Sequence, residues 1–163
     1  MSRTTIILLA LALSLQGARA VLAQDGESLS ARIADTIKVY ETDWVLESSA
    51  VFPYSEMLKN EPLFFNWHDL NQKYYVTAQV LIHTTEEDAA LSLKNENIRQ
   101  GWRGKISSSN VRGLGDDVYE WKGTGLYDKD LGYYFRKGKV VVLINSSSKP
   151  AAKRFALRIA KQL

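Results

Sequence analysis

Apolar and polar residues alternate most regularly over residues 74–84. Val76, Ala78, Val80 and Ile82 are apolar, and most of the residues between them are polar. Successive side chains of a β-strand point to opposite faces, so a period of two is typical of a strand with one face in the core. The pattern therefore predicts a strand over residues 74–84, with these four side chains on its buried face.

A period near 3.6 residues, which is typical of an amphipathic helix, occurs at both ends of the chain. Leu29, Ile33 and Ile37 follow it within residues 28–40, where we expect a first helix. Pro150 suits the first turn of a last helix, because the N–H that proline lacks has no helical partner there. The apolar stripe of that last helix is formed by Ala152, Phe155, Ala156, Ile159, Ala160 and Leu163.

Three more strands are predicted in the C-terminal half, over residues 117–122, 131–137 and 139–145. Gly138 lies between the last two, at a tight turn where glycine tolerates a positive φ. Residues 140–144 are apolar at every position, which indicates a strand that is buried on both faces.

Two segments of the chain, 62 residues apart, resemble each other. Residues 80–85 (VLIHTT) align with residues 142–147 (VLINSS), and an Ala-Ala pair follows each of them. The aligned segments 80–93 and 142–155 are identical at five of fourteen positions. Two explanations account for this similarity equally well. One is an ancient duplication, and the other is that any junction between a strand and a capped helix has this form. Either explanation predicts two matching strand-to-helix units.

A middle helix is expected after the first of these strands. Thr84-x-x-Glu87 has the form of a capping box, in which the hydroxyl and the carboxylate each accept a hydrogen bond from a free backbone N–H. The helix would run to about residue 100 and carry Leu91, Ile98 and Trp102 on one side.

The pattern is weakest over residues 45–72. Residues 45–52 and the aromatic segment 63–67 are strand candidates, and Asn71-Gln72 is a plausible hairpin turn. In sum, the sequence predicts an α+β fold: a single-domain sandwich over residues 24–163, with an antiparallel sheet of about five or six strands and helices packed on it.

Residues 1–23 have the features of an export signal. Arg3 provides the positive start, and the ten-residue segment 6–15 has Ser14 as its only polar residue. This core is shorter than the roughly 20 apolar residues of a membrane span. We expect cleavage after Ala23, although Ala20 also fits, and no transmembrane segment in the mature chain. The localisation expected from this segment is periplasmic or secreted.

The absence of cysteine from the chain has two consequences. The exported protein would not be a lipoprotein, since it has no thiol to acylate, and its fold would hold together without disulfides. Removal of Arg3 and Arg19 with the signal leaves 19 basic and 18 acidic residues, a net charge of +1. A charge this close to neutral argues against nucleic acid as a partner.

Catalytic chemistry has few candidate residues. The sequence has neither a cysteine nucleophile nor a Gly-x-Ser-x-Gly elbow, and its two histidines, His68 and His83, lack the spacing of a metal site. They could act with the acidic pair Asp116 and Asp117 in a small hydrolase or metal-dependent enzyme. We favour structural roles for these four residues, and we expect the protein to hold no metal or cofactor.

Aromatic residues are frequent on the predicted strands. A ligand- or partner-binding surface would be formed by Tyr75, Tyr119, Trp121, Tyr133 and Phe135 if they share one face of the sheet. Packing under a helix is the alternative explanation for the same residues.

Three stretches resemble a recurring type of small exported bacterial domain: residues 111–119 (VRGLGDDVY), residues 134–142 (YFRKGKVVV), and the Ala/Phe/Ile/Leu helix after them. Some domains of this type resemble the sandwich of the photosystem II extrinsic protein P (PsbP). The resemblance covers about 90 residues and implies a non-catalytic accessory or binding role.

The favoured function is thus an exported, non-enzymatic domain that binds a protein partner or a small apolar ligand. The alternatives are the small enzyme described above and a structural component of the cell envelope.

Overall fold

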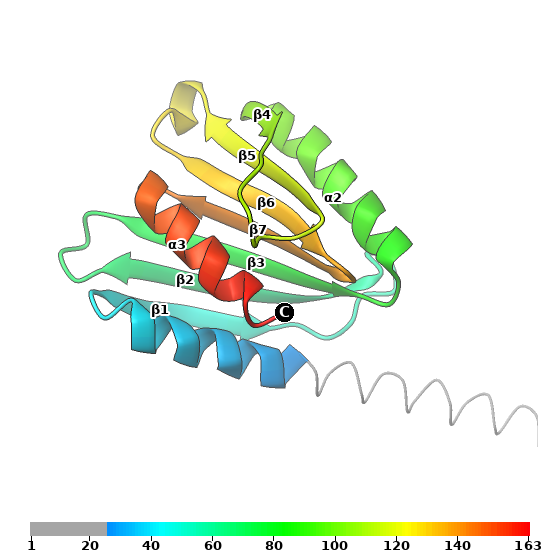
Figure 1. Cartoon of the computed structure of the whole chain (residues 1–163), viewed down its shortest axis with the longest axis horizontal. Coiled ribbons are helices and arrows are strands. Elements are labelled where there is room, and N and C mark those ends of the chain that lie inside the picture. The colour runs from blue at the N-terminus through cyan, green and yellow to red at the C-terminus, as the bar shows by residue number, and fades with distance from the viewer. Residues whose placement is uncertain (1–25) are drawn as a thin grey trace, which may run out of the picture.

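The computed structural model describes residues 26–163 (Figure 1). The predicted export signal, residues 1–23, lies outside the described residues. A helix over residues 26–40 comes first. It is followed by β1 (Trp44–Val51), β2 (Asn60–Asp69), β3 (Tyr75–His83), α2 (Glu86–Gly101), β4 (Gly104–Ser108), β5 (Asp117–Gly123), the 3-10 turn η1 (Gly125–Tyr127), β6 (Leu131–Lys137), β7 (Val140–Ser146) and α3 (Lys149–Ala160).

The strands form one antiparallel sheet in the order β1-β2-β3-β7-β6-β5-β4. The α+β class is therefore confirmed, with seven strands instead of the five or six expected. The strand that the sequence did not reveal is β4, a five-residue edge strand in which four of the five side chains are glycine or polar. Its ladder to β5 comes from backbone hydrogen bonds, which do not require an apolar pattern.

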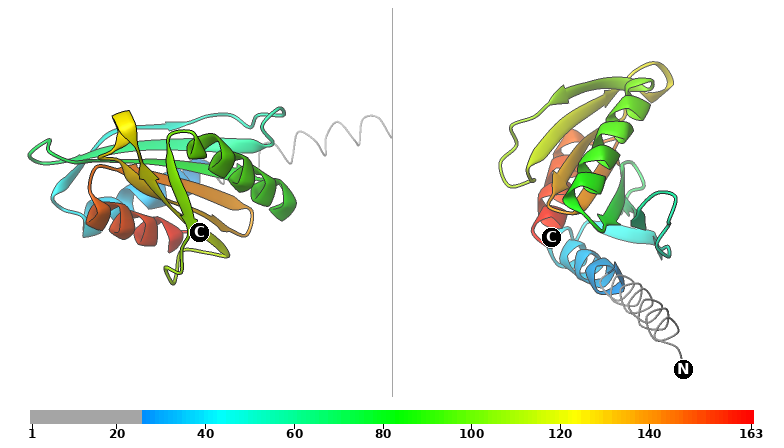
Figure 2. Two further views of the ribbon diagram at one scale, coloured as in Figure 1. Left: turned by 90° about the horizontal axis from the view of Figure 1, so that it is seen from above. Right: turned by 90° about the vertical axis from the view of Figure 1, so that its right-hand side faces the viewer.

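Helices cover both faces of the sheet. The N-terminal helix and α3 pack on one face, where Ile33 and Phe155 are fully buried. The other face carries α2, which buries Ala89 and Leu93. Figure 1 shows α3 in front of the strands, and the right-hand view of Figure 2 shows α2 and α3 on opposite sides of them.

The larger core contains a cluster of aromatic rings around α3. The ring of Phe155 makes edge contacts with Trp44, at 5.1 Å between centroids, and with Trp67, at 5.2 Å. Phe65 stacks on Trp67 from the same strand face, also at 5.2 Å. This cluster ties β1, β2 and α3 together through side chains from distant parts of the sequence.

Several local predictions are confirmed. The even positions of β3, from Val76 to Ile82, lie in the larger core, as does the apolar stripe of α3. Gly138 has a φ of 56° at the turn between β6 and β7. In β7, Val142 and Ile144 belong to the larger core and Val141 and Leu143 to the smaller one, so this strand is buried on both faces.

Two predictions about α2 are wrong. The N-cap is Thr85, not Thr84, and its hydroxyl accepts a hydrogen bond from the N–H of Asp88 at 3.0 Å. Of the apolar side predicted for this helix, Ile98 is 59% exposed and Trp102 is 88% exposed. The helix instead packs on the sheet through Ala89 and Leu93, which belong to the smaller core.

Within residues 26–163, no helix combines the length and the apolar composition that crossing a bilayer requires.

Candidate functional site

The sheet face that carries α2 is only partly covered. The helix packs on β3, β7, β6 and β4, toward one side of the sheet. Over β2 and β3, this face presents the cross-strand pairs Asn60–His83, Pro62–Leu81, Phe64–Gln79, Asn66–Thr77 and His68–Tyr75. These pairs line up along the two strands because alternate residues of each strand point to the same face.

Two adjoining cavities lie over this row of residues, and both include Phe64 and Gln79. We call them together the sheet groove. The first lies between β2, the β1–β2 loop and α2, and the second lies over β1, β2, β3 and β7. Each has a volume of about 380 Å³. The two linings comprise Met57, Leu58, Lys59, Asn60, Pro62, Leu81, Asp88, Leu91, Ser92, Asn95, Glu96 and Arg99 in the first, and Ser48, Ser49, Ala50, Phe65, Asn66, Thr77, Ala78, Leu143 and Asn145 in the second.

The end of the groove beside α2 combines exposed apolar side chains with polar and charged ones. Phe64 is 38% exposed, and Phe52 packs edge-on against it at 5.4 Å. Met57 and Leu58, from the loop between β1 and β2, are exposed beside it. Four charged residues belong to this lining. Glu96 and Arg99 contact each other at 2.6 Å, and the other two are Lys59 and Asp88.

The other end of the groove is uncharged. Asn66, Thr77 and Asn145 line it together with apolar residues such as Leu143, and its lining includes no acidic or basic residue. The hydroxyl of Tyr134 donates to Oδ1 of Asn145 at 2.8 Å, which fixes the orientation of that amide. Its NH₂ group is thereby directed away from Tyr134, where it can donate to a ligand.

Two buried polar atoms at the α2 end of the ladder have no hydrogen-bond partner among the described residues. Nδ1 of His83 lies 2.8 Å from the carbonyl oxygen of Lys59, to which it must donate, so Nε2 is left as an acceptor. Asn60, which lies opposite His83, donates from Nδ2 to the carbonyl of Leu58 and leaves Oδ1 unpaired. Burial lowers the pKa of His83, so the neutral imidazole is the stable form.

The five aromatic residues predicted as a binding surface do not share one face of the sheet. Tyr133 and Phe135 are buried in the larger core, and Trp121 is buried under α2, where its Nε1 donates to the carbonyl of Gln100. Tyr119 is partly buried beside Trp121. Tyr133 and Phe135 thus lie on the α3 face of the sheet, and Tyr119 and Trp121 lie on the α2 face.

Tyr75 differs from the other four. It is partly exposed, and it lies on the groove face of β3, two residues before Thr77. Its hydroxyl donates to Asp130 at 2.5 Å, and burial together with this hydrogen bond raises the pKa of the phenol. A contact of Tyr75 with a ligand stays a prediction.

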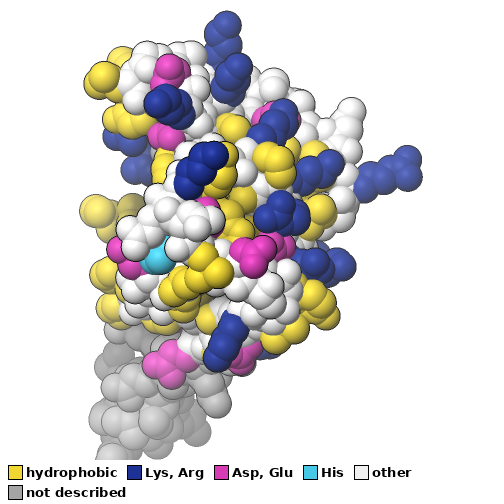
Figure 3. Space-filling model, turned by 90° about the vertical axis from the view of Figure 1, so that its left-hand side faces the viewer, with side chains coloured by type: hydrophobic (Ala, Val, Ile, Leu, Met, Phe, Trp, Pro, Cys, Tyr) yellow, Lys and Arg dark blue, Asp and Glu magenta, His cyan; other side chains and the backbone are white. Residues whose placement is uncertain are grey.

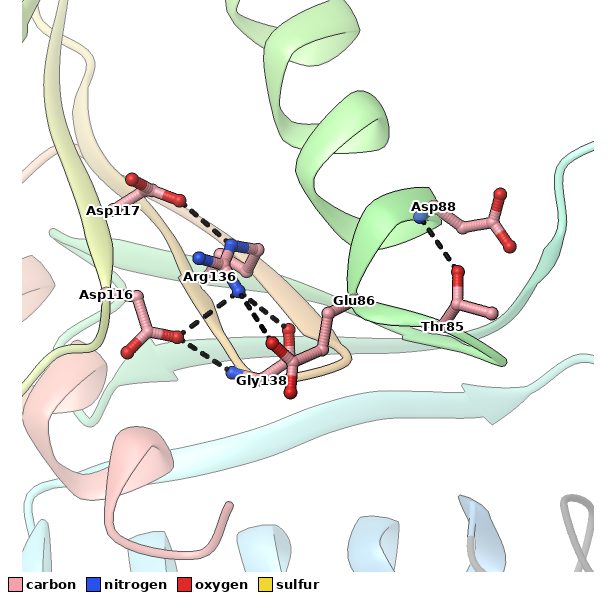
Figure 4. A network of polar contacts seen from close by, with 7 residues as sticks. All are labelled: Thr85, Glu86, Asp88, Asp116, Asp117, Arg136 and Gly138. Carbon is pink, nitrogen blue, oxygen red and sulfur yellow. Dashed lines mark hydrogen bonds and ion pairs between the residues drawn. The ribbon is translucent and has the colours of Figure 1, made fainter.

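The residues of the predicted small enzyme lie apart. His68 and His83 are at opposite ends of the β2–β3 ladder, eight residue pairs apart, which is about 26 Å at the usual strand rise. Asp116 and Asp117 are both held by Arg136, at 3.3 and 2.9 Å. Figure 4 shows this arginine between the two aspartates and Glu86 at the start of α2.

The Arg136 network has a structural explanation. Oδ2 of Asp116 also accepts from the N–H of Gly138 at 3.1 Å, and Arg136 donates to the Gly138 carbonyl at 3.2 Å (Figure 4). These bonds join the β6–β7 turn to the start of β5. Within residues 26–163, no three His, Asp or Glu side chains come close enough together to hold a metal ion.

Sequence reasoning missed the groove itself. Phe64 and Gln79 were placed on strands, yet nothing in their local pattern shows which strands become neighbours or where the helix stops covering the sheet. The available signal was the alternation within residues 63–67, where Leu63, Phe65 and Trp67 are apolar and Asn66 is polar, but this pattern does not identify the neighbouring strands.

Comparison with known proteins adds information on the fold. No protein-family model matches this chain, and no curated protein matches it. Among solved structures, it is similar to the extracellular domain of PknH from Mycobacterium tuberculosis, with a TM-score of 0.57 and 10% identity over 86% of this chain and 95% of that one. A GTP binding regulator from Thermotoga maritima aligns with a TM-score of 0.48 and 12% identity over 80% of this chain and 85% of that one. The first similarity supports the α+β sheet-and-helix fold of this chain, whereas its finer resemblance to the PsbP sandwich stays a prediction.

Proposed function

We propose that this chain is an exported, non-enzymatic binding domain that holds a small amphipathic molecule in the sheet groove. The observation that carries the proposal is that two cavities adjoin on one face of the sheet and share Phe64 and Gln79 in their linings. Each cavity is within the range of about 300–1,000 Å³ that is usual for small-molecule sites.

The chemistry of the lining indicates the kind of ligand. An apolar part would lie over Phe64, Pro62 and Leu81, because exposed aromatic and aliphatic surface gains free energy when it is removed from water. A neutral polar part would lie beside Asn66, Thr77 and Asn145, where amide and hydroxyl groups offer hydrogen bonds without a net charge. No acidic or basic residue lines that end, although Oε2 of Glu47 accepts from Nδ2 of Asn66 at 2.6 Å.

Two further observations support parts of the proposal. Tyr75 extends the uncharged end along the same strand face, so a longer ligand would reach its ring. The PknH domain of similar fold is extracellular, which agrees with the export signal predicted from residues 1–23.

The test is binding of N-phenyl-1-naphthylamine, a neutral apolar fluorescent probe, to the folded protein. Phe64→Asp places a charge where the two cavities meet, and we expect it to weaken binding by about tenfold or more, because the contact of a large apolar side chain contributes roughly 1.5–3 kcal/mol. Leu46→Asp is the matched control. Leu46 is 37% exposed, close to the 38% of Phe64, but it pairs with Trp67 on the opposite face of the sheet and lines a cavity between β1 and the N-terminal helix.

Circular dichroism of both variants checks that they fold. Equal loss of binding in the two variants, or no saturable binding by the wild type, would contradict a ligand site in the groove. The second result would instead favour the structural envelope role, which requires no small-molecule site.

A further inference from the structure

A cavity with a different chemistry lies on the opposite side of the sheet, and we infer that it binds a phosphoryl group. It has a volume of about 440 Å³ and is lined by Arg112, Gly113, Arg154, Leu157, Arg158 and Lys161. We call it the α3 cavity. Four of its six lining residues are cations, and none is an acid.

Two segments far apart in the sequence build this cavity. Arg154, Leu157, Arg158 and Lys161 recur at helical spacing, so they share one side of α3 and the turn that follows it. The loop between β4 and β5 crosses to this side of the sheet, because Leu114 is fully buried in the core that contains α3. This loop brings Gly113 against Leu157 and places Arg112 at the cavity.

Two of the cations are already held in place. Nε of Arg154 donates to Oε2 of Glu41 at 2.9 Å, and Nε of Arg158 is 3.9 Å from Oε1 of the same carboxylate. The guanidinium of Arg158 also lies 4.3 Å from the centre of the Tyr40 ring, which is a favourable cation–π distance. The Glu41 side chain is only 5% exposed, so it positions the two arginines from beneath.

The other two cations have no acidic partner. Among residues 26–163, Arg112 and Lys161 make no hydrogen bond or ion pair with a carboxylate. Glu41 neutralises one of the four positive charges, which leaves an excess of three around one cavity. Such a concentration of like charge is unfavourable unless solvent or a bound anion offsets it.

The dipole of α3 explains part of this arrangement. Cations near the C-terminus of a helix are favourable by themselves, which accounts for Arg158 and Lys161. It does not account for Arg112, which comes from a loop and adds to the same charge. Guanidinium groups present several N–H donors in a plane that matches phosphate oxygens, so three arginines and a lysine around a cavity suit a phosphoryl group better than a monovalent anion.

Basic side chains also occur elsewhere on the surface. Figure 3 shows dark blue Lys and Arg side chains over the upper and right parts of one end of the molecule. Net charge alone would therefore attract anions weakly, and the experiment must separate the cavity from the general charge. This inference is independent of the sheet groove, which lies across the sheet.

In the test, inorganic phosphate is titrated into the protein at low ionic strength. Binding is measured by isothermal titration calorimetry and by the NMR shifts of the arginine Nε–H groups. We expect saturable one-to-one binding. The double variant R112Q/K161Q removes the two unpaired cations and should weaken it by roughly a hundredfold, since each lost charge-assisted hydrogen bond lowers affinity by about tenfold. K94Q/K153Q is the matched control: it removes the same net charge from exposed lysines that lie outside the α3 cavity.

A second experiment distinguishes a free phosphate from a lipid head group. Sedimentation with vesicles of phosphatidylglycerol and phosphatidylcholine is compared with sedimentation with phosphatidylcholine alone. If the protein binds the anionic vesicles, and R112Q/K161Q loses this binding while K94Q/K153Q keeps it, the phosphoryl group belongs to a lipid head group. If the protein binds inorganic phosphate but not the vesicles, the ligand is a soluble phosphate.

Equal weakening by the two double variants would overturn the inference, because it would mean that only net charge attracts the anion. Absence of saturable binding to both phosphate and anionic vesicles would overturn it as well. Neither result would affect the binding of the neutral probe to the groove, so failure here and failure of the proposed function can be told apart.

Discussion

Val80 of β3 and Val142 of β7 lie directly opposite each other at the centre of the sheet. They are also equivalent positions in the two similar segments of the sequence, 62 residues apart. The similar strands therefore pair with each other, and a local two-fold axis through this pair relates them. On each side of the axis, three consecutive strands are neighbours, β1-β2-β3 and β5-β6-β7, and a helix follows each set.

The two strand-to-helix junctions have the same length, but their positions in the aligned segments differ by one residue. β3 ends at His83 and α2 begins at Glu86, whereas β7 ends at Ser146 and α3 begins at Lys149, one residue later than a shift of 62 would place them. Successive residues of a strand point to opposite faces, so one extra residue turns the chain toward the other face. This agrees with the packing of α2 and α3 on opposite faces.

The two junctions also differ in their caps, which leads to a first prediction. The hydroxyl of Thr85 accepts from Asp88 N–H, whereas Ser148 makes no such bond at the start of α3. Thr85→Ala should lower the free energy of unfolding by about 1 kcal/mol, because a backbone donor loses its partner. Ser148→Ala, the matched control, should change it by only a few tenths of that value. Urea denaturation measures both, and equal losses would contradict the difference between the caps.

A second prediction concerns pH and His83. Burial lowers the pKa of this imidazole in the folded protein below its ordinary value of 6.5. As the pH falls below 6.5, the unfolded chain takes up a proton that the folded protein resists, so the free energy of unfolding should decrease. The decrease should continue until the pH reaches the lowered pKa of the folded state.

The measurement is urea denaturation of the wild type and two variants between pH 7.5 and pH 5. His83→Gln should lose this part of the pH dependence. His68→Gln should keep it, because His68 is only partly buried and lies at the other end of the strands. A pH dependence that is unchanged in His83→Gln would assign it to another group.

A third prediction concerns Gly132 in β6. A Cβ atom at this position would lie 2.0 Å from the carbonyl oxygen of Ile144 in the neighbouring strand, so the two strands would have to separate. Gly132→Ala should therefore lower the free energy of unfolding by roughly 2–3 kcal/mol. Gly101→Ala is the control, since a Cβ there meets nothing within 4 Å and the residue ends α2. We expect it to be neutral or to stabilise the protein by up to about 1 kcal/mol. Thermal denaturation of the two variants gives the comparison, and a Gly132→Ala protein as stable as the wild type would refute the close approach.

Local patterns in the sequence were sufficient for many elements. The alternation of β3, the apolar run of β7 and the stripe of α3 each reflect a rule that acts within a few residues. Gly138 belongs to the same group, because a tight turn between two adjacent strands requires a residue that tolerates a positive φ. Such features depend on backbone geometry and on which side chains avoid water, and the local sequence determines both.

The tertiary structure alone decided which surfaces remain open. Tyr133 and Trp121 look alike on neighbouring strands, yet the register places them on opposite faces under different helices. The sheet groove exists because α2 covers one side of its face, and the α3 cavity exists because a distant loop brings Arg112 to α3. These outcomes depend on contacts between residues far apart in the chain, which no local periodicity encodes.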